Sequence, residues 1–402
     1  MRVLHICYFG VKENLVQTQV LPYLEKLASH GHQMSILTFE PDFYLKWNQA
    51  AIDQFRVQLA ARGINWIPTA YHKRPAIPAT LYDVCRGVIL IWRMSRRSRI
   101  DLLHARSHIP MLIGLIARKL TGAALLFDIR GLMADEYADA GLWRSSSIIY
   151  RVIKSLERFG IRMSDHLVVL TKRLKEHLIE QGQSTSDRIS VIPCCIDMRR
   201  FTDYDDTKKI RLPFQVIYAG SVTGLYLLEE MGRLFLAISR LVPEATLKIL
   251  TSVSPSETAL VLGKLGIDPS RFDIQSVTPD QVPQLLRAAT VGISFRKPTF
   301  SQIAASPTKI PEYLIAGLPV VSSVGIGDTD KILCSENVGI LVDQLNDFGY
   351  DDAAQRLLTL LKDPHLQLRC QTVARRYFDL DDVGERLYAN AYQKIEGIIG
   401  LK

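Results

Sequence analysis

The order of apolar and polar positions along the 402-residue chain predicts strands and helices that alternate from end to end. Apolar runs such as RVLHICYF at 2–9, QMSILTF at 33–39 and ALLFDIRG at 124–131 have the length and composition of buried strands. Between such runs lie stretches with a helical spacing of apolar positions, such as PMLIGLIARKLTG at 110–122. The pattern therefore predicts an α/β protein with doubly wound parallel sheets, which bind ligands at the carboxyl ends of their strands.

The chain is longer than one hydrophobic core usually supports, so we expect two domains. After RISVIPCCID the composition shifts to a polar, charged stretch near 203–213, which we interpret as a linker, and a new strand begins with FQVIYAGS. The second half then repeats the strand and helix pattern. We expect domains at residues 1–203 and 204–380, with a C-terminal helix at 381–402 that packs back on the first domain.

Composition narrows the class of protein. Hydrophobic residues make up 48% of the chain and charged residues 22%, which is the balance of a soluble globular protein. Six cysteines show no zinc or redox spacing, so we expect them to be reduced. The N-terminus lacks a signal-peptide cleavage site, and no apolar stretch reaches the roughly 18 residues of a spanning helix. A cytoplasmic location is therefore expected.

The formal net charge is +8, which suits an anionic membrane surface, a nucleic acid or a phosphorylated ligand, or serves solubility alone. The run RGVILIWRMSRRSRI at 86–100 mixes arginines with apolar residues at helical spacing. It indicates either a solvated basic helix or an interfacial helix that touches anionic lipid. No nucleic-acid-binding module is recognisable, and nucleic acid is not expected as a partner.

Ionisable residues gather at two strand ends of the first half. The segment LLHARSH carries His104, Arg106 and His108, and FDIRGLMADE carries Asp128, Arg130, Asp135 and Glu136. Charges where an apolar strand stops are costly unless they face solvent or a ligand. A structural ion-pair cluster and satisfied core histidines are the alternatives to a catalytic or acceptor-binding site, which we favour.

A second cluster lies in VIYAGSVTGLY at 216–226 and SPTKIPEYLIAG at 306–317. Glycines at a strand-to-helix turn let the backbone approach a phosphate, although a plain turn accounts for them equally well. Lys309 opposes the dipole of the helix it begins unless an anion is bound there, which predicts a phosphate site. Glu312 is either an exposed helical glutamate or an acceptor for ligand hydroxyls. No carboxylate pair suited to a divalent cation is evident, so metal-independent chemistry is expected.

These segments together resemble family 4 glycosyltransferases of the GT-B fold. SPTKIPEYLIAGLPVVSSVGIGDTD followed by NVGILV is similar to the donor-binding signature of that family. LLHARSH, FDIRGLMADE, LVVLT, VIPCCID and YAGSVTGLYLLEEM are similar, in order, to segments of a bacterial subgroup. The resemblance covers nearly the whole chain.

The resemblance implies two Rossmann-like domains facing a cleft, with acceptor binding in the first and nucleotide-sugar binding in the second. It implies a retaining transferase of the hexosyltransferase class that needs no metal or cofactor and uses a UDP- or GDP-sugar. The implied donor-binding residues are Gly220, Ser221, Thr251, Arg296, Ser306, Pro307, Thr308, Lys309 and Glu312, with Glu312 on the ribose and Lys309 near the diphosphate. The implied catalytic residues are Asp128, Arg130 and Glu136, and the acceptor-side residues are His104, Arg106 and Asp135.

The chain departs from the family in its catalytic details. The first glutamate of the family's Glu-x7-Glu pair falls on Ala304. In the turn that opens the second domain, Ser221 and Leu225 stand where the family often has Arg and Lys, and Arg296 or Lys297 is a candidate substitute. The usual acceptor-side histidine is replaced by the Asp128–Arg130 pair.

The sequence thus predicts a glycosyltransferase of cell-surface polysaccharide or glycolipid biosynthesis, acting on a saccharide or lipid-linked acceptor at the inner face of the cell membrane. A nucleotide-sugar epimerase on the same fold is one alternative. A catalytically idle subunit that binds a partner transferase is another, motivated by Ala304.

Overall fold

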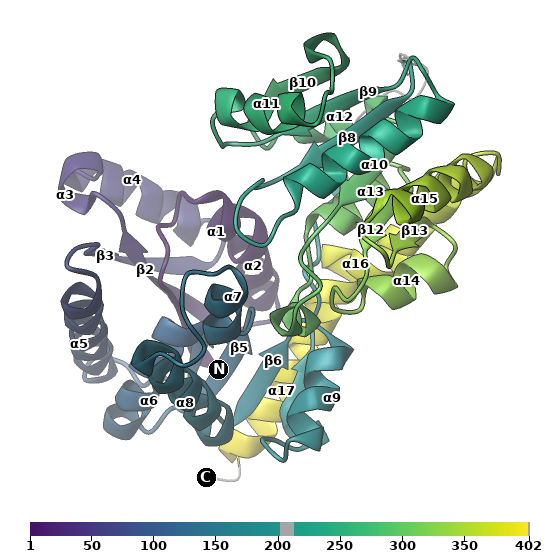
Figure 1. Ribbon diagram of the computed structural model, residues 1–402. Coiled ribbons are helices and arrows are strands. Elements are labelled where there is room, and N and C mark those ends of the chain that lie inside the picture. The colour runs from purple at the N-terminus through teal and green to yellow at the C-terminus, as the bar shows by residue number, and fades with distance from the viewer. Residues whose placement is uncertain (202–212, 401–402) are drawn as a thin grey trace. The chain divides into compact units, whose positions relative to one another are not determined.

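The computed structural model describes residues 1–201 and 213–400, and its internal contacts divide the chain into two compact units (Figure 1). Unit 1 comprises Met1–Ala134, Arg144–Pro193 and Leu380–Lys402. Unit 2 comprises Asp135–Trp143 and Cys194–Asp379. The expected domain boundary at 203/204 and the expected linker near 203–213 lie almost wholly outside the described residues. The chain passes from one unit to the other at 134/135, 143/144, 193/194 and 379/380.

Unit 1 is built on a seven-stranded parallel sheet in the order β3-β2-β1-β4-β5-β6-β7. Its strands are the apolar runs of the first half, and helices cover the sheet on both sides (Figure 1). The strands are β1 (Arg2–Cys7), β2 (Gln33–Glu40), β3 (Ile64–Ala70), β4 (Leu102–Arg106), β5 (Ala124–Ile129), β6 (His166–Val169) and β7 (Ile189–Val191). The strand order reverses between β1 and β4, which is where such sheets open a ligand site.

The helices of unit 1 follow the predicted strand–helix alternation. They are α1 (Asn14–Gln19), α2 (Leu21–Ser29), α3 (Phe43–Lys46), α4 (Gln49–Ala60), α5 (Ala76–Ser95), α6 (His108–Thr121), α8 (Ile148–Met163), α9 (Lys172–Glu180) and α17 (Glu385–Gly400), and α7 (Met133–Asp139) spans the boundary to unit 2. The basic helix predicted within 86–100 is the end of α5, so Arg96 and the residues after it follow the helix.

The C-terminal helix α17 belongs to unit 1, which confirms that the chain returns to its first domain. It follows a π-helical turn, Leu380–Gly384, and contacts α2, β6 and β7. Tyr388, Ala391, Tyr392 and Ile395 recur at three- and four-residue spacing and are all buried, because they form the apolar stripe of an amphipathic helix.

Unit 2 has a six-stranded parallel sheet in the order β10-β9-β8-β11-β12-β13. The strands are β8 (Gln215–Ala219), β9 (Thr246–Leu250), β10 (Phe272–Gln275), β11 (Val291–Ser294), β12 (Val320–Ser323) and β13 (Gly339–Val342). The helices are α10 (Leu228–Leu241), α11 (Pro255–Lys264), α12 (Val282–Ala288), α13 (Lys309–Ile315), α14 (Thr329–Ser335), α15 (Asp347–Leu360) and α16 (Leu366–Phe378). Short 3-10 turns include η5 (Phe300–Ala304).

The core of unit 2 forms a single cluster that includes the apolar residues of β8, β11 and β12 and the buried face of α13. Gly292 on β11 leaves room for the ring of Tyr313, because a Cβ there would lie 2.4 Å from that ring. This close packing fixes α13, which carries Lys309 and Glu312, against the sheet. The two parallel sheets confirm the predicted α/β, doubly wound class.

Candidate functional site

In unit 2 the candidate residues gather at the carboxyl ends of β8, β9 and β11. Gly220 follows β8, Thr251 follows β9 and Arg296 lies two residues after β11. Because parallel strands end at the same edge of a sheet, segments far apart in sequence meet there. The Gly220 N–H donates to the Leu250 carbonyl at 2.9 Å, and Tyr226 pairs with Arg296 in an isolated β-bridge.

Lys309 is the central group of this site. Its side chain enters from the first position of α13 and is only 6% exposed. Its Nζ donates to the hydroxyl of Tyr218 at 2.7 Å and lies 4.0 Å from the Tyr218 ring centre and 4.3 Å from that of Tyr226. Among the residues that the structure describes, no carboxylate forms an ion pair with it.

Gly220 allows Lys309 to occupy this position. A Cβ at residue 220 would lie 2.8 Å from the lysine Nζ, which is closer than real Cβ contacts come. The backbone at Gly220 has φ +143°, a conformation that favours glycine. The turn therefore requires glycine for two independent reasons.

A second cation, Arg296, lies near the same aromatic rings. Its guanidinium carbon is 4.9 Å from the Tyr226 ring centre, and its buried Nε has no hydrogen-bond partner among the described residues. Burial, and then the charge of Arg296, lower the pKa of Lys309 well below its usual range. Glu312 acts on this pKa in the opposite direction, but neither cation forms an ion pair with the described residues, and such a site favours an incoming negative charge.

Glu312 lies three residues after Lys309, in the first turn of α13 as expected, and is partly exposed. Burial raises its pKa from the ordinary value of 4.5 to about 7, and Arg200 and Lys309 act in the opposite direction. No residue of the described chain donates a hydrogen bond to its carboxylate, which stays available to ligand hydroxyls.

Three of the remaining donor-side candidates, all of them hydroxyl residues, form hydrogen bonds within the protein itself. The Ser306 hydroxyl accepts from the Cys194 N–H at 3.1 Å, and the Thr251 hydroxyl accepts from the Val253 N–H at 3.2 Å. Thr308 occupies the N-cap of α13 but makes no side-chain capping bond, so capping does not account for it. The Ser221 hydroxyl lies 3.2 Å from that of Thr223, and Pro307 is buried.

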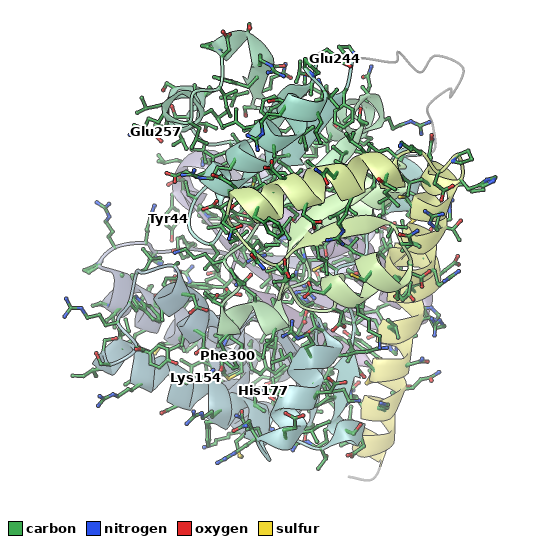
Figure 2. The ribbon with its side chains drawn as sticks, turned by 45° about the vertical axis from the view of Figure 1, so that its right-hand side comes forward. Tyr44, Lys154, His177, Glu244, Glu257 and Phe300 are labelled. Carbon is green, nitrogen blue, oxygen red and sulfur yellow. The ribbon has the colours of Figure 1, made fainter. Side chains whose placement is uncertain are left out.

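Ala304, where the family has its first glutamate, ends the turn η5 and is fully buried. Two buried neighbours, Ser301 and Gln302, bond each other, and the Gln302 Oε1 has no partner among the described residues. Ser301 also donates its N–H to the carboxylate of Asp139 at 3.1 Å. Phe300, labelled in Figure 2, begins the same turn and is 46% exposed.

In unit 1 the candidate residues meet because of strand register. His5 pairs with His104 between β1 and β4, and Arg106 pairs with Asp128 between β4 and β5. The Arg106 guanidinium lies 3.2 Å from the Asp128 carboxylate, and the rings of His5 and His104 are 4.4 Å apart. The register thus brings together residues that the sequence suggested only as separate strand ends.

Asp128 is the centre of this buried cluster and is 0% exposed. It accepts hydrogen bonds from Arg106, from Arg130 at 3.4 Å and from the Tyr388 hydroxyl at 3.2 Å. Burial alone would raise its pKa, but Arg130, His104 and Arg106 outweigh burial and hold the pKa well below its usual range. This geometry agrees with the ion-pair alternative, since the carboxylate remains ionised and positions two arginines.

His104 forms a second link to α17, because its Nδ1 lies 2.9 Å from the Tyr392 hydroxyl. Burial is the largest cause that lowers the pKa of His104. His108, at the start of α6, bonds Glu157 of α8 at 2.8 Å and therefore serves helix packing. Asp135 and Glu136 lie in the first turn of α7 and are grouped with unit 2, not with the strand-end cluster of unit 1.

Four tyrosines belong to these sites but were not among the predicted residues. Tyr218 and Tyr226 stand in the same segment as Gly220, so that segment carried a usable signal. Tyr388 and Tyr392 lie 260 and 288 residues from their partners, and nothing in the local pattern indicated them. Over residues 1–201 and 213–400, no group of three His, Cys, Asp or Glu side chains is arranged to hold a metal ion.

The chain is similar to known glycosyltransferases. Residues 16–195 match the family model of the glycosyl transferase 4-like domain. D-inositol 3-phosphate glycosyltransferase of Salinispora arenicola is 24% identical over 326 residues, which are 75% of this chain and 70% of that protein.

Two solved structures share the fold over nearly the whole chain. Sucrose-phosphate synthase of Thermosynechococcus elongatus has a TM-score of 0.73 at 15% identity, covering 99% of this chain and 100% of that one. HepE of Anabaena, in complex with UDP and glucose, has a TM-score of 0.66 at 16% identity, covering 97% and 99%. The first half of the chain thus carries a glycosyl transferase 4-like domain, and the two parallel-sheet units have the GT-B fold of these glycosyltransferase structures.

Proposed function

We propose that the protein transfers a sugar from a nucleotide-sugar to an acceptor, with the diphosphate of the donor bound at Lys309 and Arg296. The observation that carries this proposal is the buried ammonium of Lys309, which has no anionic partner within the described chain. Burying an unpaired charge is costly, so such a group is retained where a ligand supplies the opposite charge. A UDP moiety, which HepE binds, has this chemistry.

The same cations would stabilise the departing diphosphate. As the bond to the sugar breaks, negative charge grows on the phosphate oxygens, and fixed positive groups lower the energy of that state. Arg296 and Lys309 are held by the rings of Tyr218 and Tyr226 before the donor arrives, so little reorganisation is needed. This supports a reaction that needs no metal or other cofactor and, by resemblance to the family, proceeds with retention.

We further assign Glu312 to the ribose hydroxyls, because its carboxylate is partly exposed and accepts nothing from the described chain. On the acceptor side, Asp128 acts as a positioning residue that holds Arg106 and Arg130, since it is buried and fully engaged. Glu136, which is partly exposed on α7, is the better candidate to receive the acceptor proton.

The proposed acceptor is a saccharide or a lipid-linked saccharide of cell-surface polysaccharide or glycolipid biosynthesis, and the proposed location is the cytoplasmic side of the membrane. Cys7, Cys85, Cys334 and Cys370 are free thiols in the structure, which is typical of a reducing compartment.

The test of the donor site is Lys309→Met, with binding of UDP and GDP measured by calorimetry. We expect at least a thirtyfold loss of affinity for the preferred nucleotide, corresponding to about 2 kcal/mol for a buried charge pair. The unliganded variant should melt no lower than the wild type, because the substitution removes an unpaired buried charge. Lys248→Met is the matched control, since Lys248 pairs with Asp273 on the neighbouring strand.

Two outcomes would contradict the donor site. Wild-type protein that binds neither nucleotide would overturn it and would favour the catalytically idle subunit. Lys309→Met protein that binds the nucleotide as tightly as Lys248→Met would move the diphosphate elsewhere. Donor turnover without any acceptor would instead indicate the epimerase alternative.

A further inference from the structure

Three neighbouring helices of unit 1, α5, α6 and α8, present large apolar side chains to solvent. Helix α6 packs against both α5 and α8, so the three form one continuous layer, here called the α5–α6–α8 face (Figure 1). Its exposed apolar residues are Ile77, Leu81, Tyr82, Ile89 and Trp92 on α5, Ile116 and Leu120 on α6, and Ile148, Ile149, Val152, Phe159 and Met163 on α8. Single exposed apolar residues are ordinary, but a set gathered on adjoining helices marks an interaction surface.

Helix α8 carries the clearest pattern. Ile148, Val152, Phe159 and Met163 are 79%, 51%, 52% and 46% exposed. At about 100° per residue these four positions fall within roughly 60° of one another, which makes one stripe along the helix. The stripe faces solvent, because the opposite side of α8 buries Gly160 and Ile161 against the unit.

A row of arginines runs beside this stripe. Arg151, Arg158 and Arg162 are all exposed and lie about 40–80° to one side of Ile148 on the helix surface. The only acidic residue of α8, Glu157, is 1% exposed and bonds His108 at 2.8 Å and Lys154 at 2.6 Å. Lys154, labelled in Figure 2, is thus occupied by Glu157, while the outer face of α8 carries only positive charge.

Helix α5 repeats this arrangement. Its only acidic residue, Asp83, is 0% exposed and bonds His72 at 2.6 Å and Tyr8 at 2.8 Å. Trp92 and Arg93 lie side by side on its exposed surface near the C-terminal end. Helix α6 has no acidic residue and adds Lys119 in its last turn, while Arg118 in the same turn pairs with Asp165 at 3.0 Å. Across the three helices, every carboxylate points inward.

We propose that the α5–α6–α8 face rests on the surface of an anionic lipid bilayer. The stripe of α8 and Trp92 would enter the boundary between headgroups and acyl chains, and the arginines would contact lipid phosphates. A face that combines apolar stripes with charge of one sign fits such a surface, whereas protein interfaces commonly pair charges of both signs. Within the described residues no helix is long and apolar enough to cross a membrane, so the contact proposed is a surface one.

This inference extends the proposed function, and only its link to a lipid-borne acceptor rests on that proposal. It also changes which helix is expected to contribute most to the contact. The run at 86–100 suggested α5 alone, whereas the structure adds α8, whose Ile148 is at 79% the most exposed apolar side chain of the face. Substitutions on the two helices should therefore weaken vesicle binding in different ways. Apolar side chains of α8 are expected to provide most of the insertion into the bilayer, whereas basic side chains of both helices contribute to the electrostatic attraction.

The test uses the full chain and vesicles of phosphatidylglycerol mixed with phosphatidylcholine, compared with pure phosphatidylcholine, in a flotation assay. We expect binding to the anionic vesicles that falls as salt is raised. Ile148→Asp combined with Phe159→Asp should reduce the partition coefficient at least tenfold. Arg151→Gln, Arg158→Gln and Arg162→Gln together should reduce binding to anionic vesicles, as should neutralising Arg93, Arg96 and Arg97.

The matched control is Phe348→Asp on α15 of unit 2, because Phe348 is 73% exposed and lies outside the proposed face. It should leave vesicle binding unchanged. In a Trp143→Phe background, brominated lipids should quench the emission of Trp92, and Trp92→Phe should remove most of that quenching, since Trp47 and Trp66 are buried while Trp143 is partly exposed. This readout reports contact at α5 directly.

Wild-type protein that does not float with anionic vesicles would overturn the inference. It would also be overturned if Phe159→Asp converted a dimer into a monomer in sedimentation velocity while vesicle binding was absent, because the face would then join two copies of this chain. Nucleotide binding, measured on the same samples, reports separately on the proposed function and should be the same in all the α8 variants.

Discussion

At the residue scale, the proposed donor site is defined by charged groups that form no ion pair with the described residues. Lys309 is buried against two tyrosine rings, and Glu312 is on the same short helix with a raised pKa. Each group is in an unfavourable state until a ligand arrives, since the lysine lacks an anion and the glutamate lacks hydrogen-bond donors. Ligand binding should therefore relieve costs that the empty protein bears.

Glu312 predicts a specific pH dependence. Its pKa is raised from 4.5 to about 7 in the folded protein, so the folded state holds a proton that the unfolded chain releases at lower pH. The contribution of Glu312 to stability is present below about pH 4.5 and is lost as the pH rises towards 7. Between pH 5 and 8 the unliganded wild type should lose about 1–3 kcal/mol of unfolding free energy relative to Glu312→Gln.

Urea unfolding of both proteins at several pH values measures this difference. Nucleotide affinity of the wild type should rise over the same interval, because ionised Glu312 accepts the ribose hydroxyls, and Glu312→Gln should lack that rise. Parallel stability curves for the two proteins would return Glu312 to the role of an ordinary surface glutamate.

At the scale of elements, the turn after β8 and the start of α13 form one structure. Gly220 holds a positive φ and leaves the space that the Lys309 side chain fills. The Ala219 N–H donates to the Tyr313 hydroxyl at 2.8 Å, so the strand end is tied to α13 on a second side. The proposed phosphate site therefore depends on how strand and helix pack, and not on a glycine-rich loop alone.

Gly220→Ala tests this coupling. The new Cβ would force the Lys309 ammonium away, so nucleotide affinity should fall at least tenfold, and backbone strain should cost about 1–2 kcal/mol of stability. Gly266→Ala is the matched control, because Gly266 has φ +79° but no atom within 4 Å of an added Cβ. It should lose similar stability with unchanged nucleotide affinity in calorimetry. Equal affinities in both variants would show that Lys309 does not need the space.

At the scale of the whole molecule, the last helix of the chain completes the first unit. Helix α17 supplies Tyr388 to Asp128 and Tyr392 to His104, and it buries Ile395. The apolar core of unit 2 is a separate cluster of buried residues, and the last of these residues in the chain is Phe378. The two units should therefore respond differently when the C-terminal segment is removed.

A chain that ends at Asp379 should lose the fold of unit 1 while unit 2 persists. Its buried ionic cluster would lose two tyrosine hydroxyls and an apolar cover, which is more than a domain of marginal stability tolerates. Limited proteolysis with mass spectrometry should leave residues 213–379 protected and digest Met1–Ala134 and Arg144–Pro193 of the first unit. Tyr392→Phe is the milder comparison and should cost about 1–3 kcal/mol, since it leaves the buried His104 Nδ1 without its partner. A truncated chain that resists digestion throughout would contradict this division.

Local sequence patterns were sufficient to predict the α/β class and the donor-side residues. These patterns are the strand runs, the helical spacing of apolar residues and the segments around Gly220 and Lys309, and each of them depends only on residues close together in the sequence. The prediction of the acceptor-side residues was less complete. Asp128 and His104 were identified, but their degree of burial depends on neighbouring strands and on α17, which no local window contains.

The sequence by itself determined the alternation of elements and the glycosyltransferase family resemblance, and it predicted an anion site, because these depend on residue type and on spacing within one segment. Only the tertiary structure decided that Tyr388 and Tyr392 reach partners 260 and 288 residues away, and that α8 turns its apolar stripe to solvent. The sequence pattern of an apolar helical stripe is the same whether the stripe faces a protein core or a lipid surface. The helix buries the side that packs better against the protein, and the apolar stripe then faces solvent. In α8 the buried side carries Gly160, Ile161 and the paired Glu157.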